Sequence, residues 1–315
     1  MKIAVLGAGG VGGYFGAKLA AAGEDVNFIA RGAHLQAIQS NGLQVYSANG
    51  DVLVKPARAT SDPATVGPVD LVMIAVKLWA TDEAVRDAKP LIGPATVVVS
   101  FQNGVVAVDA ITRACGKEHT LGGVANIAAV IEKPGVIRHT GTMAQLSVGE
   151  LDKKPSARAQ AFVDACAKAG IQARVSDDIT KTIWEKYVFL VAASAMTSLT
   201  RLPLGAVRED PDTRALTAQI MSEVVAVGKT KGVQLDVALV ETLLQRLDGM
   251  PREMVASMLG DLERGSRLEL PWLSGGVVQM GNESGVPTPA NRFVLAALKH
   301  YINGRSADAR TLLRG

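Results

Sequence analysis

The chain is poor in cysteine, and this shortage argues against a cysteine-based metal site and against a fold held together by disulfides. Only two of its 315 residues are cysteine. Cys115 and Cys166 show neither the spacing of a metal site nor that of a disulfide framework. We therefore expect reduced thiols, no metal site and a cytosolic protein.

A strong excess of charge and a high aromatic content are also absent. The chain carries 33 basic and 30 acidic residues, a net charge of +3, and 4% aromatic residues. It therefore offers neither the basic patch nor the stacking platforms that nucleic-acid binding needs. The most apolar candidate for a membrane segment, residues 187–196, is too short to cross a bilayer. Because the first residues lead directly into an expected strand, we expect no signal peptide and a cytoplasmic location.

The apolar content, 48% of the residues, is large enough for two domains. Up to about residue 176, strand-like and helical runs alternate, which predicts an α/β fold with a doubly wound parallel sheet of the Rossmann type. The Gly-rich segment 119–150 is different, and we expect it to add antiparallel strands at one edge. The expected strands are 2–6, 25–29, 43–46, 52–54, 70–75, 96–100, 125–131, 136–139, 145–148 and 172–175. The expected helices of this half are 11–22, 33–40, 81–88, 106–114 and 156–169.

After residue 177 nearly every segment has a helical pattern. The expected helices are 179–199, 211–231, 236–247, 252–265, 272–284 and 289–303, separated by proline and glycine. The sequence thus predicts an NADP-binding domain over 1–176 and an all-helical substrate and dimerisation domain over 177–315. We expect the substrate site in the cleft between two such domains.

Three glycines follow the first strand directly, in the pattern G-x-G-x-x-G. Gly7 permits a tight turn, Gly9 lets the backbone approach a pyrophosphate, and Gly12 lets the next helix pack close to the strand. The phosphates would bind the unpaired N–H groups at the positive end of that helix. This pattern predicts a dinucleotide site; the alternative is that the glycines only form a turn.

The end of the second strand indicates which dinucleotide binds. Enzymes that prefer NAD usually place an acid there, whereas NADP needs a cation for its 2′-phosphate. Here the strand is followed by Arg31, with no acid in reach, and its planar guanidinium suits a phosphate dianion. We therefore predict NADPH; the alternative is a solvated arginine at the start of the next helix.

Two polar residues follow later strands of the expected sheet. Lys77 and Asn103 should lie at the carboxyl ends of these strands, where open α/β sheets bind their ligands. Lys77 could contact a phosphate or the substrate, and Asn103 the nicotinamide ribose or the substrate. The alternatives are a surface lysine and an Asn-Gly turn.

In the helical half, Lys186 begins an apolar stretch without another charge until Arg201. A buried cation is costly unless it is paired or functional, and desolvation lowers the pKa of a lysine toward the range useful for proton donation. Further on, Ser257 and Asp261 share a helical face, and Glu269 could reach into the cleft from the end of that helix. The alternatives are a lysine at the rim, a solvated helix face and a surface salt bridge.

The motifs described above, in the order in which they occur along the chain, resemble those of the ketopantoate reductases (2-dehydropantoate 2-reductases), NADPH enzymes of pantothenate biosynthesis. The resemblance implies a Rossmann-type domain followed by an all-helical one, Lys186 as the general acid on the 2-keto oxygen, and Asn103 and Glu269 as assisting groups. A homodimer is implied by the family alone. The residues implied to bind the cofactor are Gly7, Ala8, Gly9, Gly10, Val11, Gly12, Arg31, Lys77 and Asn103.

The residues implied to bind the substrate are Ser257, Lys186, Ser194 and Leu190, and the last two depart from the family. Members that act on ketopantoate carry asparagines at both positions and near the next Pro-x-Gly turn, where this chain has Leu204. Replacing one such amide by an apolar group costs about 1–3 kcal/mol. We expect reduction of a 2-ketoacid, foremost 2-dehydropantoate. The alternatives are a less polar 2-ketoacid or ketone, or a non-catalytic NADPH-binding protein.

Overall fold

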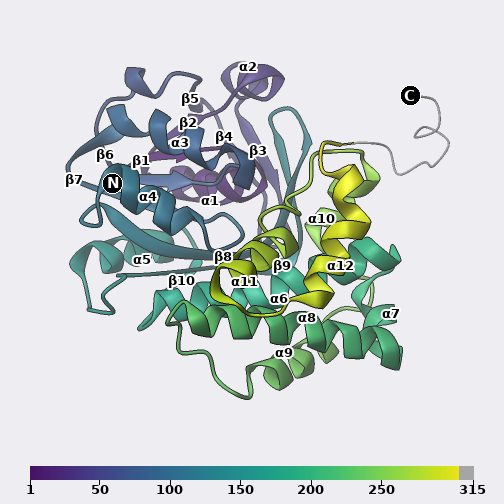
Figure 1. The fold of residues 1–315 in the computed structure, drawn as a ribbon. Coiled ribbons are helices and arrows are strands. Elements are labelled where there is room, and N and C mark those ends of the chain that lie inside the picture. The colour runs from purple at the N-terminus through teal and green to yellow at the C-terminus, as the bar shows by residue number, and fades with distance from the viewer. Residues whose placement is uncertain (305–315) are drawn as a thin grey trace. The chain divides into compact units, whose positions relative to one another are not determined.

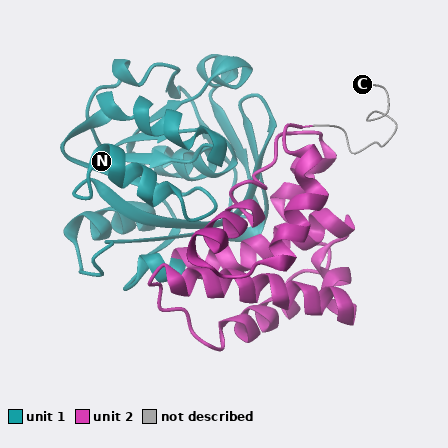
Figure 2. Cartoon of the chain, viewed as in Figure 1, with its two compact units in different colours: residues 1–182 teal, residues 183–315 magenta. Residues whose placement is uncertain are grey.

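The computed structural model describes residues 1–304 and divides the chain into two compact units (Figures 1 and 2). Unit 1 is Met1–Thr182, and unit 2 begins at Ile183, inside helix α6 (Ile179–Thr200). The sequence pattern placed the change at residues 176 and 177, just before this helix. Residues 305–315, assigned there to the second domain, lie outside the described residues.

Unit 1 contains the doubly wound parallel sheet that the sequence predicts (Figure 1). Its strands lie in the order β8-β7-β6-β1-β2-β5, and all neighbours are parallel. The direction of winding reverses between β1 and β6, and ligands bind at such a reversal in open α/β sheets. The bounds of these strands are β1 (Lys2–Leu6), β2 (Asp25–Ile29), β5 (Arg58–Thr60), β6 (Val69–Ile74), β7 (Ile92–Ser100) and β8 (Thr120–Lys133).

The Gly-rich segment adds an antiparallel strand to the β8 edge of this sheet, as expected. The three short strands predicted within 125–148 are in fact the two arms of one hairpin, β8 and β9, each 14 residues long. The predicted interruption is a shift of register, with Ile127 opposite Ala144 but Ala129 opposite His139. The sheet continues from β9 to three short strands, of which the sequence predicts each one. Their bounds and that of β9 are β3 (Leu43–Tyr46), β4 (Val52–Val54), β9 (Val136–Gly149) and β10 (Gln172–Val175).

Helices cover both faces of the parallel sheet. Alternate residues of β1 belong to different cores, with Ile3 and Val5 on one face and Ala4 and Leu6 on the other, because side chains of a strand alternate between its two faces. This double burial explains why the parallel strands are apolar nearly throughout. The helices of unit 1 are α1 (Gly10–Ala21), α2 (Gly32–Asn41), α3 (Thr81–Asp87), α4 (Ala107–Cys115) and α5 (Ala157–Lys168).

Unit 2 is built from helices, as predicted, with one short helix that the sequence did not indicate. This helix, α7, begins at Leu204 directly after Pro203, where the proline and glycine suggested a break. Glu223 of α8 is buried and accepts hydrogen bonds from the backbone N–H groups of Ala290 and Asn291 at 2.8 and 2.9 Å, which fixes the start of α12. The remaining bounds are α7 (Leu204–Glu209), α8 (Pro211–Thr230), α9 (Leu239–Asp248), α10 (Ser257–Glu263), α11 (Ser274–Ser284) and α12 (Pro289–Leu298).

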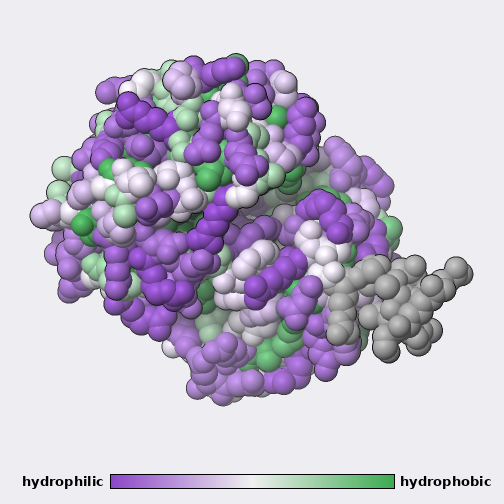
Figure 3. Space-filling model, turned by 90° about the horizontal axis from the view of Figure 1, so that it is seen from above, coloured by the Kyte–Doolittle hydropathy of each residue, from purple (hydrophilic) through white to green (hydrophobic). Residues whose placement is uncertain are grey.

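The face of the molecule drawn in Figure 3 is mostly hydrophilic, with scattered apolar residues. Within residues 1–304, no helix combines the length and the apolar character that crossing a membrane requires. Nor do these residues bring three His, Cys, Asp or Glu side chains together as a metal site. Both cysteines are free thiols, and burial raises the pKa of Cys166 to about 12.

Candidate active site

The glycine-rich turn of unit 1 lies at the reversal point of the sheet. Gly7 has a φ of +97°, a value that glycine adopts readily. Its N–H donates to the Ile29 carbonyl at 3.1 Å, and a Cβ at this position would lie 2.9 Å from the backbone of Ala75 and Val76. The turn therefore packs against the end of β6 as well as that of β2, and only a glycine fits there.

Gly9 and Gly12 differ sharply in their surroundings. A Cβ on Gly9 would meet no atom within 4 Å, so there is open space beside the start of α1. A Cβ on Gly12 would overlap the carbonyl oxygen of Gly7 and lie 2.8 Å from Val5. Among the described residues no side chain caps α1, and its first turn holds no acid. The open backbone and the helix N-terminus fit the pyrophosphate of a dinucleotide.

The other residues of the turn have structural surroundings that the sequence pattern did not indicate. A Cβ on Gly10 would overlap the backbone of Ala129, so strand β8 packs directly on this glycine. Ala8 is buried and Val11 half-buried. The Ala8 carbonyl lies 2.7 Å from Nε2 of His34, whose Nδ1 accepts from the Gly135 N–H at 3.0 Å. Nε2 must then carry the proton, so a neutral His34 ties the turn to α2 and to the β8–β9 hairpin.

Arg31 follows β2 as predicted, but the expectation that no acid lies in reach of it is wrong. Its side chain is 60% exposed, and its two terminal nitrogens donate to Glu83 at 2.8 Å and to Asp87 at 2.9 Å. Both acids are on α3, more than 50 positions away in the sequence. Reasoning along β2 could not find them, because the fold brings α3 beside the end of that strand.

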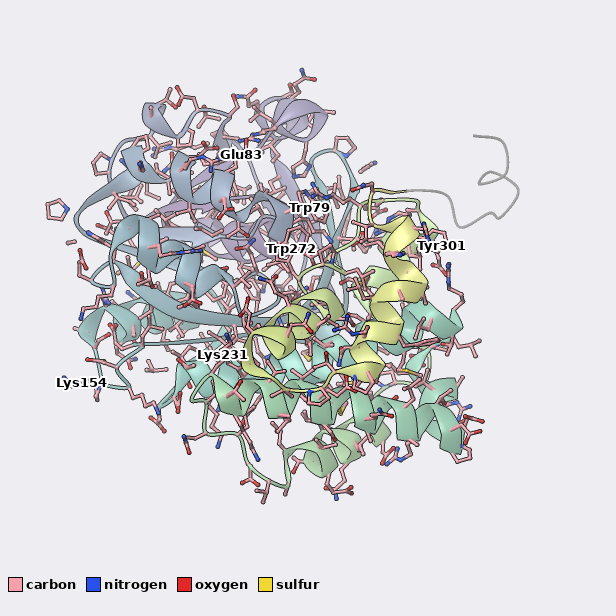
Figure 4. All side chains as sticks on the ribbon, in the orientation of Figure 1. Trp79, Glu83, Lys154, Lys231, Trp272 and Tyr301 are labelled. Carbon is pink, nitrogen blue, oxygen red and sulfur yellow. The ribbon has the colours of Figure 1, made fainter. Side chains whose placement is uncertain are left out.

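Lys77 and Asn103 follow the neighbouring strands β6 and β7, at the same edge of the sheet. Lys77 is exposed, and its ammonium group lies 5.9 Å from the ring centre of Trp79, which Figure 4 labels. Asn103 is half-buried. The buried Gln102 donates to the Val76 carbonyl at 3.0 Å and to Thr81 at 2.8 Å. Gln102 therefore joins the loop of Lys77 to that of Asn103, a role that the sequence did not indicate.

The candidate proton donor of unit 2 lies beside a buried carboxylate. Lys186 is half-buried in the second turn of α6. Burial lowers the pKa of its ammonium group to about 8, and the charge of Glu269 acts in the opposite direction and raises it. Glu269 is 6% exposed, in the loop between α10 and α11. A lysine with a pKa near 8 can hold a proton at neutral pH and still release it to a reacting group.

Tyr187 anchors the loop that carries Glu269. Its hydroxyl lies 2.8 Å from the Trp272 carbonyl and 2.9 Å from that of Leu273, and the N–H groups of these two residues donate to the Glu269 carbonyl at 2.9 and 3.1 Å. Burial raises the pKa of Tyr187, so the phenol stays protonated and can donate. Because Tyr187 is next to Lys186 in the chain, this contact holds the loop of Glu269 against the lysine's helix.

The residues expected to contact the substrate differ in exposure. Ser257 is exposed at the start of α10, whereas Asp261 is buried on the same helix and paired with Arg264 at 2.8 Å. Leu190 is half-buried one turn after Lys186. Ser194 is 1% exposed, and its hydroxyl has no hydrogen-bond partner within the described part of the chain.

Leu204 follows Pro203, as the Pro-x-Gly pattern predicts, but its side chain is buried. It is the first residue of α7 and is 1% exposed, and its N–H donates to the Met254 carbonyl at 2.8 Å. Its side chain therefore belongs to the packed interior of unit 2.

Both units match models of one enzyme family. The model for ketopantoate reductase PanE/ApbA matches residues 3–153, and that for its C-terminal part matches residues 178–302. The chain belongs to the ketopantoate reductase family. It is 36% identical to a 2-dehydropantoate 2-reductase of Mesorhizobium japonicum, over 95% of this chain and 97% of the relative.

Solved structures agree with this membership. A PanE/ApbA family ketopantoate reductase from Ralstonia eutropha JMP134 superposes with a TM-score of 0.86 at 33% identity, over 96% of this chain and 98% of the other. A D-mandelate dehydrogenase with NADH and anilino(oxo)acetate shares the fold, with a TM-score of 0.87 at 23% identity, over 96% and 98% of the two chains.

Membership in the ketopantoate reductase family settles the class of the protein. It is an oxidoreductase that acts on a CH–OH group and uses a nicotinamide cofactor, and the substrates of its family are small ketoacids. The alternative of a non-catalytic dinucleotide-binding protein is therefore set aside.

Proposed function

We propose that the enzyme uses NADPH to reduce a 2-ketoacid to the 2-hydroxy acid, with 2-dehydropantoate as the foremost candidate. The observation that carries the proposal is the pair in unit 2, a lysine whose pKa burial lowers to about 8 beside the buried carboxylate of Glu269. Perturbed lysines of this kind are typical of proton-transfer sites.

In this proposal unit 1 binds the cofactor. The N–H groups at the start of α1 would hold the pyrophosphate in the space beside Gly9, and Arg31 would meet the 2′-phosphate. Lys77 and Asn103, at the ends of β6 and β7, are assigned to the nicotinamide side. When bound, the reduced nicotinamide supplies the hydride for the substrate carbonyl.

Lys186 supplies the proton. As the ketone carbon gains the hydride, the electron pair of the C=O bond moves to oxygen, and the ammonium group first stabilises that charge and then donates its proton. Glu269 favours the protonated lysine, because its charge raises the pKa that burial lowers. Asn103 would assist by donating a hydrogen bond to the substrate.

A second candidate is a less polar 2-ketoacid or ketone, because the substrate wall carries few polar groups. Leu190 is half-buried one helical turn from Lys186. Ser194, two turns away, is buried, and its hydroxyl has no hydrogen-bond partner among residues 1–304. Neither position supplies the amide that ketopantoate binding would use. A substrate oxygen that is buried here without its amide donor costs about 1–3 kcal/mol, or roughly 5- to 150-fold in affinity.

A panel of substrates distinguishes the two candidates. The oxidation of NADPH would be followed with 2-dehydropantoate and with plain, branched and aromatic 2-ketoacids at matched concentrations. A kcat/KM for 2-dehydropantoate near 10⁵ M⁻¹s⁻¹, within the usual enzyme range of about 10⁴–10⁸, and above that of every other acid supports the first candidate. A preference for a branched or aromatic acid by tenfold or more supports the second. Oxidation with none of them contradicts the proposal.

A further inference from the structure

The ion pairs of Arg31 suggest that residues outside β2 help to determine which cofactor the chain prefers. Glu83 and Asp87 lie four residues apart on α3, hence on one face of that helix. Each accepts from a different terminal nitrogen of Arg31, at 2.8 and 2.9 Å. Glu83, labelled in Figure 4, is 48% exposed and Asp87 is 35% exposed.

The cluster is anionic, although it contains the arginine. One guanidinium and two carboxylates sum to a charge of −1, whereas the 2′-phosphate of NADP is itself a dianion. Such a phosphate must either replace the carboxylates on the Arg31 nitrogens or bind beside them against their repulsion. The 2′-hydroxyl of NAD carries no charge and can donate to a carboxylate oxygen, so it bears neither cost.

Two contacts fix this cluster relative to the glycine-rich turn. Arg31 is the residue before α2, and His34 in the first turn of α2 lies 2.7 Å from the Ala8 carbonyl. The N–H of Gly7 donates to the Ile29 carbonyl, two residues before Arg31. The three charged groups therefore stand at the adenosine end of the site that the turn defines.

We propose that Glu83 and Asp87 are specificity-determining residues, which restrain Arg31 and weaken its preference for NADPH over NADH. This inference rests on the proposed binding of the 2′-phosphate by Arg31. It implies that the chain binds NADH better than an unopposed arginine would allow, and that removal of the two acids strengthens the preference for NADPH.

Equilibrium binding of NADPH and NADH to the full chain tests the inference without turnover. In E83Q/D87N we expect the Kd for NADPH to fall by about 5- to 20-fold and that for NADH to change by less than about twofold. The gain should shrink at high salt, because exposed charges are screened. The control is Asp82→Asn, which removes one negative charge from the same helix at a residue that does not pair with Arg31, and it should change neither Kd by more than about twofold.

Arg31→Ala separates failure of the inference from failure of the proposed function. If R31A weakens NADPH more than NADH by tenfold or more, but E83Q/D87N leaves the NADPH Kd unchanged or raises it, the acids do not oppose the phosphate and the inference is overturned. If R31A weakens both cofactors equally, the 2′-phosphate contact of the proposed function is wrong, whatever the acids do. In R31A/E83Q/D87N we expect a smaller gain in NADPH affinity over R31A than E83Q/D87N shows over wild type, because the acids can then act only by repelling the phosphate. An equal gain in both backgrounds would show that the acids do not act through Arg31.

Discussion

Lys186→Ala is expected to lower kcat for ketoacid reduction by about a thousandfold or more, while the Kd for NADPH stays within about threefold of wild type. The substitution removes both the cation that stabilises the forming alkoxide and the proton that neutralises it. Lys186 is not among the residues assigned to the cofactor. Steady-state turnover and cofactor titration, made on the same preparation, measure the two quantities separately.

Lys231→Ala is the matched control for this substitution. Lys231 follows α8 in unit 2, is labelled in Figure 4, and forms an exposed pair with Glu283 at 3.2 Å. Exposed ion pairs contribute about 0–1 kcal/mol to stability. Loss of the Lys231–Glu283 pair should therefore change kcat by less than twofold. Near-normal turnover in K186A would remove the lysine from the mechanism. A loss of NADPH binding equal to the loss of turnover would assign it a structural role instead.

Gly9→Ala is expected to weaken NADPH and NADH alike, by about 30- to 150-fold, because the added methyl group enters the space assigned to the pyrophosphate. The loss corresponds to about 2–3 kcal/mol of hydrogen bonding between backbone N–H groups and phosphate. The fold should persist, since a Cβ on Gly9 meets nothing within 4 Å and the residue has a φ of −76°. Alanine is less favourable than glycine before a helix, which costs about 1 kcal/mol at most.

The matched control for Gly9→Ala is Gly249→Ala in unit 2. Gly249 also has a negative φ, −81°, follows the end of α9, and a Cβ there meets only the Arg246 carbonyl at 3.7 Å. Cofactor affinity should be unchanged in this variant. If Gly9→Ala binds both cofactors as tightly as wild type, the pyrophosphate does not lie on this turn. A loss confined to NADPH would place the contact at the 2′-phosphate instead.

The sequence predicts the fold well because its signals are local. The alternation of apolar strands and helices, the glycines after β1 and the change to helical periodicity all arise within segments of a few tens of residues. The sequence predicts less well the segments whose structure depends on partners far away in the chain. The β8–β9 hairpin was expected as separate short strands, because the strand pattern of β9 is interrupted between His139 and Ala144, where the register with β8 shifts.

The residues of the candidate site also divide into those with local roles, which the sequence predicts, and those with distant partners, which it does not. Gly7, Gly9 and Gly12 could be assigned from spacing alone, because their roles concern the turn and the helix that follows it. The partners of Arg31 on α3, the bonds of His34 and the link through Gln102 could not, since each joins segments far apart in the chain. No spacing rule relates Glu83 or Gly135 to the residues they contact, and only the fold brings them together.

The surroundings of Lys186 could be predicted only in part from the sequence. The sequence indicated a cation at the head of an apolar helix, hence a desolvated lysine. The buried neighbour that opposes the fall in its pKa, Glu269, comes from a loop that Tyr187 anchors. The balance between burial and that charge determines where the lysine titrates, and it required the three-dimensional structure.

The pH dependence of kcat/KM for ketoacid reduction, in wild type and in Glu269→Gln, tests the central claim most directly. A general acid must be protonated, so the rate should be level below the pKa of Lys186, about 8, and fall about tenfold per pH unit above it. Because the charge of Glu269 raises that pKa, the fall should begin at lower pH in E269Q, whereas Glu283→Gln on the surface should leave it in place. A wild-type profile that stays level from pH 7 to pH 10, or a fall that E269Q does not move, would contradict proton donation by Lys186.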